Sequence, residues 1–110
     1  MRIKTIAAAL LLAASTLTAA AQDKPATFKN PVIDRSLPDP TVIRADDGYF
    51  YLYATEDKHN LPIYRSADLV DWTFVGTAFT DQTRPKWNPR GNNWAPDINK
   101  IGDKYVVYYS

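Results

Sequence analysis

The chain has 110 residues, of which 45% are hydrophobic and 13% aromatic, and its formal net charge is +1. This composition is typical of one small folded domain and excludes an intrinsically disordered chain. The near-neutral charge gives no general electrostatic case for binding nucleic acid, and the absence of cysteine excludes a disulfide scaffold, a cysteine-ligated zinc site and a catalytic cysteine.

The first 21 residues are predicted to be a signal peptide. Arg2 and Lys4 form a basic start, an apolar run follows at residues 6–14, and three alanines lead up to the expected cleavage site after Ala21. The alternative is a buried helix. We expect export to the periplasm or the cell exterior. No transmembrane segment is expected, because this run is too short to span a bilayer and the rest of the sequence has no longer one.

The mature chain is predicted to open with a lead-in segment, residues 22–37, because neither helical nor strand periodicity holds there. Four short strands rich in β-branched and aromatic residues are then expected in chain order. They lie at residues 41–43, 49–55, 61–66 and 72–75. The turns between them carry Asp-Gly at residues 47–48 and a capping Ser66, and Gly76 is expected to end the fourth strand. A long polar loop, residues 77–93, follows.

The strand pattern restarts after this loop, which indicates a repeat. The sequences DDGYFYLYAT and IGDKYVVYYS are both typical of a turn followed by an aromatic strand, and each follows a strand that opens with Pro-Asp, at a period of about 55–58 residues. A four-stranded unit of this period favours a β-propeller, whose blades are four-stranded antiparallel sheets. The alternative, an immunoglobulin-like sandwich, gives no reason for a restart after four strands.

On this interpretation residues 38–110 are the N-terminal part of an all-β propeller. The first blade spans about residues 38–76, and the second blade starts at about residues 94–110. Propellers have about four or more blades, so the sequence is expected to be the N-terminal fragment of a longer chain. It is not expected to fold stably alone, because the faces of a single blade stay uncovered.

Two aspartates stand at the entrances of the expected inner strands, Asp39 in PDPTVIR and Asp97 in APDINKI. In a propeller, the loops that enter the inner strands gather around one mouth of the central channel, so equivalent positions on neighbouring blades bring carboxylates together. Such a pocket suits glycoside hydrolysis, since an inverting enzyme needs a general acid and a general base about 6.5–9.5 Å apart. The alternative for both aspartates is a turn residue or a cap. Trp94 either packs between blades or presents its face to a sugar ring.

The remaining polar residues carry weaker signals. His59 is the only histidine and is interpreted as an exposed loop residue. The pair Asp46 and Asp47 is expected to solvate a hairpin. The sequence contains no phosphate-binding glycine loop, zinc motif or EF-hand loop, and we assign no residue to a metal.

Three runs, LPDPTVIRADDGYFYLYAT, YRSADLVDWTFVG and WAPDINKIGDKYVVYYS, in this order and spacing, resemble the N-terminal part of glycoside hydrolase family 43. The resemblance covers about residues 30–110. It implies a five-bladed β-propeller and an inverting enzyme that acts on arabinan, arabinoxylan or xylan. It also implies three catalytic carboxylates: an aspartate base, an aspartate that orients and tunes the acid, and a glutamate acid.

Carried over by position, the resemblance implies that Asp39 is the general base. Trp94 resembles a residue that stacks on sugar, and Asp97 would bind sugar or brace the pocket. The second aspartate and the glutamate acid are expected in later blades, beyond Ser110. The 110 residues alone are therefore expected to be inactive, because they lack the general acid.

Within the family, YATED, RSADLVDWTFVGTAFTD and NWAPDI most resemble the endo-1,5-α-L-arabinanase branch, although Pro38 stands where many arabinanases have histidine. The alternatives are a β-xylosidase, an α-L-arabinofuranosidase, or a non-catalytic carbohydrate-binding propeller. The expected partner is an arabinan- or arabinoxylan-type polysaccharide or oligosaccharide. No cofactor is required; the family often holds a calcium ion near the channel centre, with ligands expected in later blades. The oligomeric state is left open.

Overall fold

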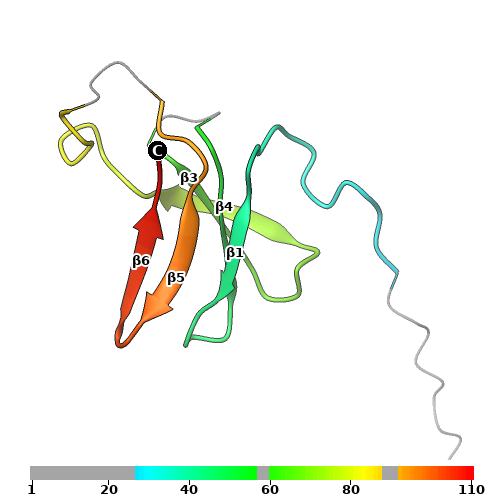
Figure 1. Cartoon of the computed structure of the whole chain (residues 1–110). Coiled ribbons are helices and arrows are strands. Elements are labelled where there is room, and N and C mark those ends of the chain that lie inside the picture. Colours follow the sequence, from blue (N-terminus) through cyan, green and yellow to red (C-terminus); the bar gives the residue numbers. More distant parts are fainter. Residues whose placement is uncertain (1–26, 57–59, 88–91) are drawn as a thin grey trace, which may run out of the picture.

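The computed structural model describes residues 27–56, 60–87 and 92–110, and within these ranges all regular structure is β-strand (Figure 1). The predicted signal peptide, its cleavage site at Ala21 and His59 lie outside the described residues. Six strands follow in chain order: β1 (Thr41–Arg44), β2 (Phe50–Tyr53), β3 (Pro62–Ser66), β4 (Trp72–Thr77), β5 (Asp97–Ile101) and β6 (Lys104–Tyr108). The prediction of an all-β chain is confirmed. The described part contains no helix long and apolar enough to cross a membrane.

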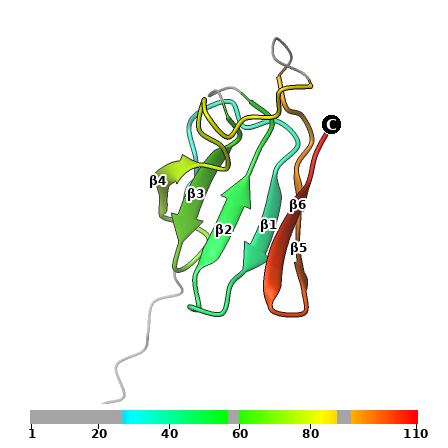
Figure 2. The same cartoon turned by 90° about the vertical axis from the view of Figure 1, so that its left-hand side faces the viewer.

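The first four strands form one antiparallel sheet in the order β1-β2-β3-β4 (Figure 2). The turn between β1 and β2 closes with a hydrogen bond of 3.0 Å from the Gly48 amide to the Ala45 carbonyl. Gly48 has a φ of 86°, which a residue without a Cβ adopts at little cost. At the β3–β4 turn, Ser66 Oγ accepts hydrogen bonds from the amides of Asp68 and Leu69, as the expected cap requires.

The expectation that Gly76 ends the fourth strand is wrong, because β4 continues to Thr77. Ile63 pairs with Gly76 while Tyr64 pairs with Phe74, so one extra residue on β4 forms a β-bulge. Gly76 has a φ of 144°, in the region that favours glycine. The glycine therefore bends the strand at the bulge and does not terminate it.

The last two strands, β5 and β6, form a separate antiparallel hairpin. Both views place β5 beside β1, and the two strands are in contact (Figures 1 and 2). The Ile98 amide donates a 3.4 Å hydrogen bond to Thr41 Oγ1 across this contact. The first strands of the two sheets, β1 and β5, thus lie side by side, and the segments that lead into these two strands lie at the same end.

A small core holds the four-stranded sheet together. Leu52, Ala54 and Tyr64 are buried on one face, and Ile33 and Leu37 pack against them from the segment before β1. Residues 27–37 contain no strand or helix, so this segment contributes side chains to the core without regular structure of its own.

The isolated 110-residue polypeptide is expected to lack a cooperative thermal unfolding transition. Few hydrophobic residues of the described part are buried, whereas Val42, Phe74, Val75, Ile101 and Tyr108 are all exposed. Such limited burial does not offset the conformational entropy of a chain of this length. Circular dichroism at 222 nm during heating measures this, with sedimentation as a check that the sample is monomeric. A sharp transition from a monomeric sample would contradict the expectation.

Candidate active site

Asp39 lies in the Pro-Asp-Pro sequence that enters β1, and its side chain is exposed. Its backbone has a φ of 49°, in the left-handed region. A non-glycine residue there costs on the order of 1–3 kcal/mol, although aspartate tolerates this region better than most residues. The flanking prolines, Pro38 and Pro40, restrict the backbone further. The carboxylate therefore starts from a backbone with few alternative conformations.

Thr55 fixes the side chain of Asp39. Its hydroxyl Oγ1 donates a 2.7 Å hydrogen bond to Asp39 Oδ2, and the Thr55 amide donates a 3.0 Å bond to the Pro38 carbonyl. Within the described residues, no protein group donates to the other carboxylate oxygen, Oδ1. One oxygen is thus held by the protein, and the other is open to a water molecule.

Sequence reasoning missed Thr55, although the hairpin register contains the signal. Thr41 pairs with Tyr53. Two residues further from the turn on each strand, the same register brings Asp39 opposite Thr55. If the register is extended beyond the ends of the expected strands, it predicts that the Thr55 hydroxyl lies next to the Asp39 carboxylate.

Trp94 lies on the segment that leads into β5, and 58% of its surface is exposed. Its backbone amide and carbonyl both bond to Ser110, at 2.7 and 3.0 Å. The next amide, that of Ala95, donates a 2.8 Å bond to Thr55 Oγ1. The Thr55 hydroxyl therefore joins the two predicted site residues, since it binds Asp39 on one side and the neighbour of Trp94 on the other.

Asp39 and Asp97 do not occupy equivalent places, contrary to the expectation from the repeat. Asp97 is the first residue of β5, whereas Asp39 lies two residues before β1. The residue that corresponds to Asp39 is Ala95, which also precedes a proline and also has a positive φ, 45°. Asp97 is exposed and pairs with Tyr108. The two Pro-Asp motifs are therefore offset by two residues relative to the strands that they precede, and Ala95 takes the place that Asp39 has before β1.

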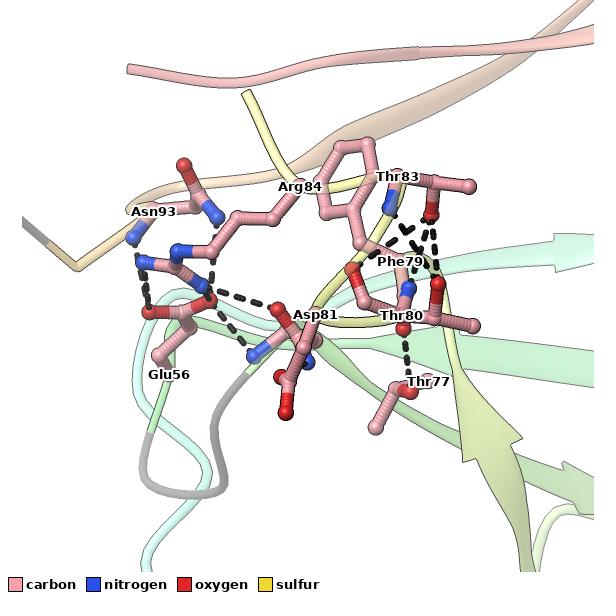
Figure 3. Close-up of polar contacts among 9 residues, drawn as sticks. Glu56, Thr77, Phe79, Thr80, Asp81, Thr83, Arg84 and Asn93 are labelled. Atoms are coloured by element: carbon pink, nitrogen blue, oxygen red, sulfur yellow. Dashed lines mark hydrogen bonds and ion pairs between the residues drawn. The ribbon is translucent and has the colours of Figure 1, made fainter. Parts of the chain in front are cut away.

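A buried polar cluster lies next to this site in the sequence and is centred on Glu56. Figure 3 shows Arg84 and Asn93 converging on its carboxylate. Arg84 donates to Oε1 and Oε2 at 2.5 and 3.1 Å. The Asn93 amide donates to Oε2 at 3.0 Å and its side chain to Oε1 at 2.9 Å, and the Asn60 amide donates at 2.6 Å. Glu56 thereby ties the β2–β3 loop to the long loop before β5.

Glu56 is ionised in this cluster. Burial by itself would raise its pKa, but hydrogen bonds from Arg84, Asn93 and Asn60 outweigh it and lower the pKa to about 2. A general acid needs a raised pKa so that it carries a proton at working pH. Glu56 therefore cannot serve as the acid of a glycosidase, although it is a glutamate one residue from Thr55.

The pair Asp46 and Asp47 does more than solvate the β1–β2 turn. Asp46 accepts bonds of 2.6 Å from Lys100 of the second sheet, which lower its pKa, and Asp47 accepts a 2.7 Å bond from Tyr51. A hollow of about 360 Å³ lies beside these residues and is lined in part by Ile43 and Tyr105. Tyr53 and Ile98 also line it, so it extends along β1 from the turn, but Asp39 is not among its lining residues.

No group of three or more histidine, cysteine, aspartate or glutamate side chains that could hold a metal ion occurs in the described part of the chain. Calcium takes about 6–8 oxygen ligands, and the described residues hold no cluster of three or more carboxylates to supply them. The ligands of the calcium ion that the resemblance implies are expected in later blades, so no described residue is assigned to it.

Residues 28–110 match the family described as glycosyl hydrolases family 43. A non-reducing end alpha-L-arabinofuranosidase of Bacteroides ovatus is 36% identical over an alignment of 90 residues, which covers 74% of this chain and 16% of the relative. An extracellular exo-alpha-(1->5)-L-arabinofuranosidase of Streptomyces chartreusis is 30% identical over 109 residues, which are 98% of this chain and 33% of the relative.

Among solved structures, the Cellvibrio cellulosa alpha-L-arabinanase in complex with arabinohexaose is similar to this chain, with a TM-score of 0.58 and 32% sequence identity. The superposition covers 68% of this chain and 24% of the arabinanase. The chain thus spans at most 33% of the length of these proteins.

Proposed function

The chain belongs to glycosyl hydrolases family 43, and from this premise we propose that the full-length protein carrying it hydrolyses arabinan. The observation that carries the proposal is one hydroxyl, that of Thr55, bonded both to the Asp39 carboxylate and to the backbone beside the exposed Trp94. A carboxylate held by a hydrogen bond next to the segment that carries an exposed aromatic residue suits a sugar chain. The arabinan-directed names of the similar proteins support the choice of substrate.

The proposed fold of the full-length protein is a five-bladed β-propeller. The sheet β1-β2-β3-β4 would be its first blade, and the hairpin β5-β6 would begin the second. The meander order and the contact between β1 and β5 support this. The Pro-Asp-Pro entrance to β1 would then open at the mouth of the central channel.

In the proposed mechanism Asp39 is the general base. Its free oxygen takes a proton from a water molecule while the water oxygen bonds to the anomeric carbon. The bond from that carbon to the glycosidic oxygen breaks, and this oxygen takes a proton from a general acid on a later blade. Attack on the face opposite the leaving group inverts the anomeric configuration. Without that acid, the 110 residues alone would not turn over substrate.

Trp94 is proposed to bind one sugar ring by stacking. Replacing Trp94 by Ala is expected to raise KM for linear arabino-oligosaccharides about tenfold, with a smaller change in kcat, because a stacked aromatic face contributes on the order of 1 kcal/mol beyond its buried area. Steady-state kinetics measure both constants. Trp87→Ala is the matched control, since Trp87 is also exposed (71%) but, within the described residues, makes no hydrogen bond to the residues around Asp39. An unchanged KM in Trp94→Ala would contradict the role.

Endo action on α-1,5-linked arabinan is the first candidate, and exo action is the second. The names of the two reported relatives, both arabinofuranosidases, favour the second, whereas the resemblance of YATED, RSADLVDWTFVGTAFTD and NWAPDI to the endo-1,5-α-L-arabinanase branch favours the first. Product analysis on linear arabinan separates them: endo cleavage gives a ladder of oligosaccharides and a rapid loss of viscosity, whereas exo cleavage gives arabinose from the start.

Asp97 is proposed to bind sugar or to brace the pocket wall. We also propose that the protein is exported, on the signal-peptide pattern of the first 21 residues. N-terminal sequencing of the protein from the producing cell would then begin at Gln22.

A further inference from the structure

The Thr55 hydroxyl has a fixed direction. A hydroxyl has one proton to donate and lone pairs to accept with. Because the Ala95 amide is a donor, Oγ1 must accept at that contact of 2.8 Å. The single proton is then available for Asp39 Oδ2 at 2.7 Å, a distance typical of a strong bond to an ionised acceptor. The two contacts therefore leave Thr55 with one hydroxyl orientation.

Thr55 and its neighbour Glu56 bind the two residues on either side of Trp94 in the segment that leads into β5. Glu56 binds Asn93 through the Asn93 amide and side chain, and the Glu56 amide donates to the Asn93 carbonyl at 3.2 Å. Thr55 binds the Ala95 amide. Trp94 lies between these two anchored residues. The same dipeptide, Thr55-Glu56, thus determines where the Trp94 backbone lies relative to Asp39.

The position of Asp39 depends on this hydroxyl more than on packing. The side chain is exposed, so no buried neighbours restrict its rotation, and Thr55 supplies the hydrogen bond to Oδ2. A misplacement of about 1 Å in a reacting group lowers a rate by about a hundredfold. Loss of the hydroxyl would free the carboxylate to rotate away from the attacking water.

We propose that Thr55 is a positioning residue for the hydrolysis: its hydroxyl orients the Asp39 carboxylate and ties it to the backbone that carries Trp94. This inference rests on the proposed function. It assigns to Thr55 a role in turnover beyond holding two loops together.

Thr55→Val in the full-length protein tests the inference, because valine keeps the shape and removes the hydroxyl. We expect kcat on linear arabino-oligosaccharides to fall by about 10- to 100-fold, with KM changed less than about threefold. Thr55→Ser, which keeps the hydroxyl, is expected to retain most of kcat. Thr55→Ala, with no added bulk, is expected to behave like Thr55→Val and replaces it if the valine variant does not fold.

Thr41→Val is the matched control. Thr41 is also a threonine whose hydroxyl accepts a hydrogen bond from a backbone amide of the second sheet, that of Ile98, but it makes no hydrogen bond to a carboxylate of the described residues. A merely structural role for Thr55 would give Thr41→Val and Thr55→Val the same loss of kcat. The inference is overturned by that result, by a Thr55→Val enzyme with more than half of the original kcat, or by a Thr55→Ser enzyme no better than Thr55→Val.

Asp39→Asn separates failure of this inference from failure of the proposed function. If Asp39→Asn retains activity, the proposed base is wrong. If Asp39→Asn is inactive while Thr55→Val is fully active, only the positioning role is wrong. In the Asp39→Asn background, Thr55→Val is expected to lower the residual kcat by less than about twofold, because its effect acts through the missing carboxylate.

Discussion

Replacing Asp39 by Asn or Ala in the full-length protein is expected to lower kcat by about 10²–10⁴-fold, the range typical of a general base. The denaturation midpoint is expected to stay close to that of the unchanged protein, because the Asp39 side chain is exposed. Hydrolysis of linear arabino-oligosaccharides and urea denaturation measure the two quantities. Activity above about a tenth of the original would rule out the base assignment.

Azide gives a second readout for Asp39→Ala. An azide ion attacks the anomeric carbon without losing a proton, so it does not need the missing base, whereas the general acid still protonates the leaving oxygen. We expect azide to restore turnover and to give a glycosyl azide of inverted configuration, visible by NMR. Asp46→Asn is the matched control: Asp46 is also exposed, but it bonds to Lys100, so its replacement is expected to leave turnover unchanged. A product of retained configuration would contradict the inverting mechanism.

Replacing Glu56 by Gln is expected to destabilise the full-length protein by roughly 3–5 kcal/mol, because it removes the ionised carboxylate that contacts the buried Arg84 guanidinium. Urea denaturation measures the change. Lys100→Met is the control, since the Lys100–Asp46 pair is exposed and exposed pairs contribute little. If the two variants lower the free energy of unfolding equally, this would contradict the view that the Glu56 cluster holds the β2–β3 loop against the long loop before β5.

The same cluster predicts a pH dependence of stability. The pKa of Glu56 is lowered from 4.5 to about 2 in the folded chain, so folding favours the ionised form. Its contribution, about 3 kcal/mol, is complete above pH 4.5 and is lost as the pH falls through about 2. Urea titrations at a series of pH values should show this loss in the unchanged protein and a weaker one in Glu56→Gln. If the free energies of unfolding of the two proteins change with pH in parallel, this would contradict the lowered pKa of Glu56.

The strands were predictable because their causes are local. Short runs of aromatic and β-branched residues and the Asp-Gly turn at residues 47–48 act within one hairpin. Gly76 was not predictable in the same way. A glycine can end a strand or form a bulge, and the register of Ile63 and Tyr64 on the neighbouring strand decides between the two.

The candidate site was likewise predictable where its sequence signals are local, and not where it depends on contacts between distant residues. The sequence by itself determined the all-β class, the restart of the strand pattern and the choice of Asp39 and Trp94 as candidates, because Pro-Asp-Pro and Trp-Ala-Pro-Asp are contiguous motifs. Only the tertiary structure decided what holds them. Thr55 and Ala95 are 40 residues apart, and Glu56 binds partners 28 and 37 residues away. Hydrogen bonds over such separations depend on how two sheets meet, and no periodicity in the chain encodes that arrangement locally.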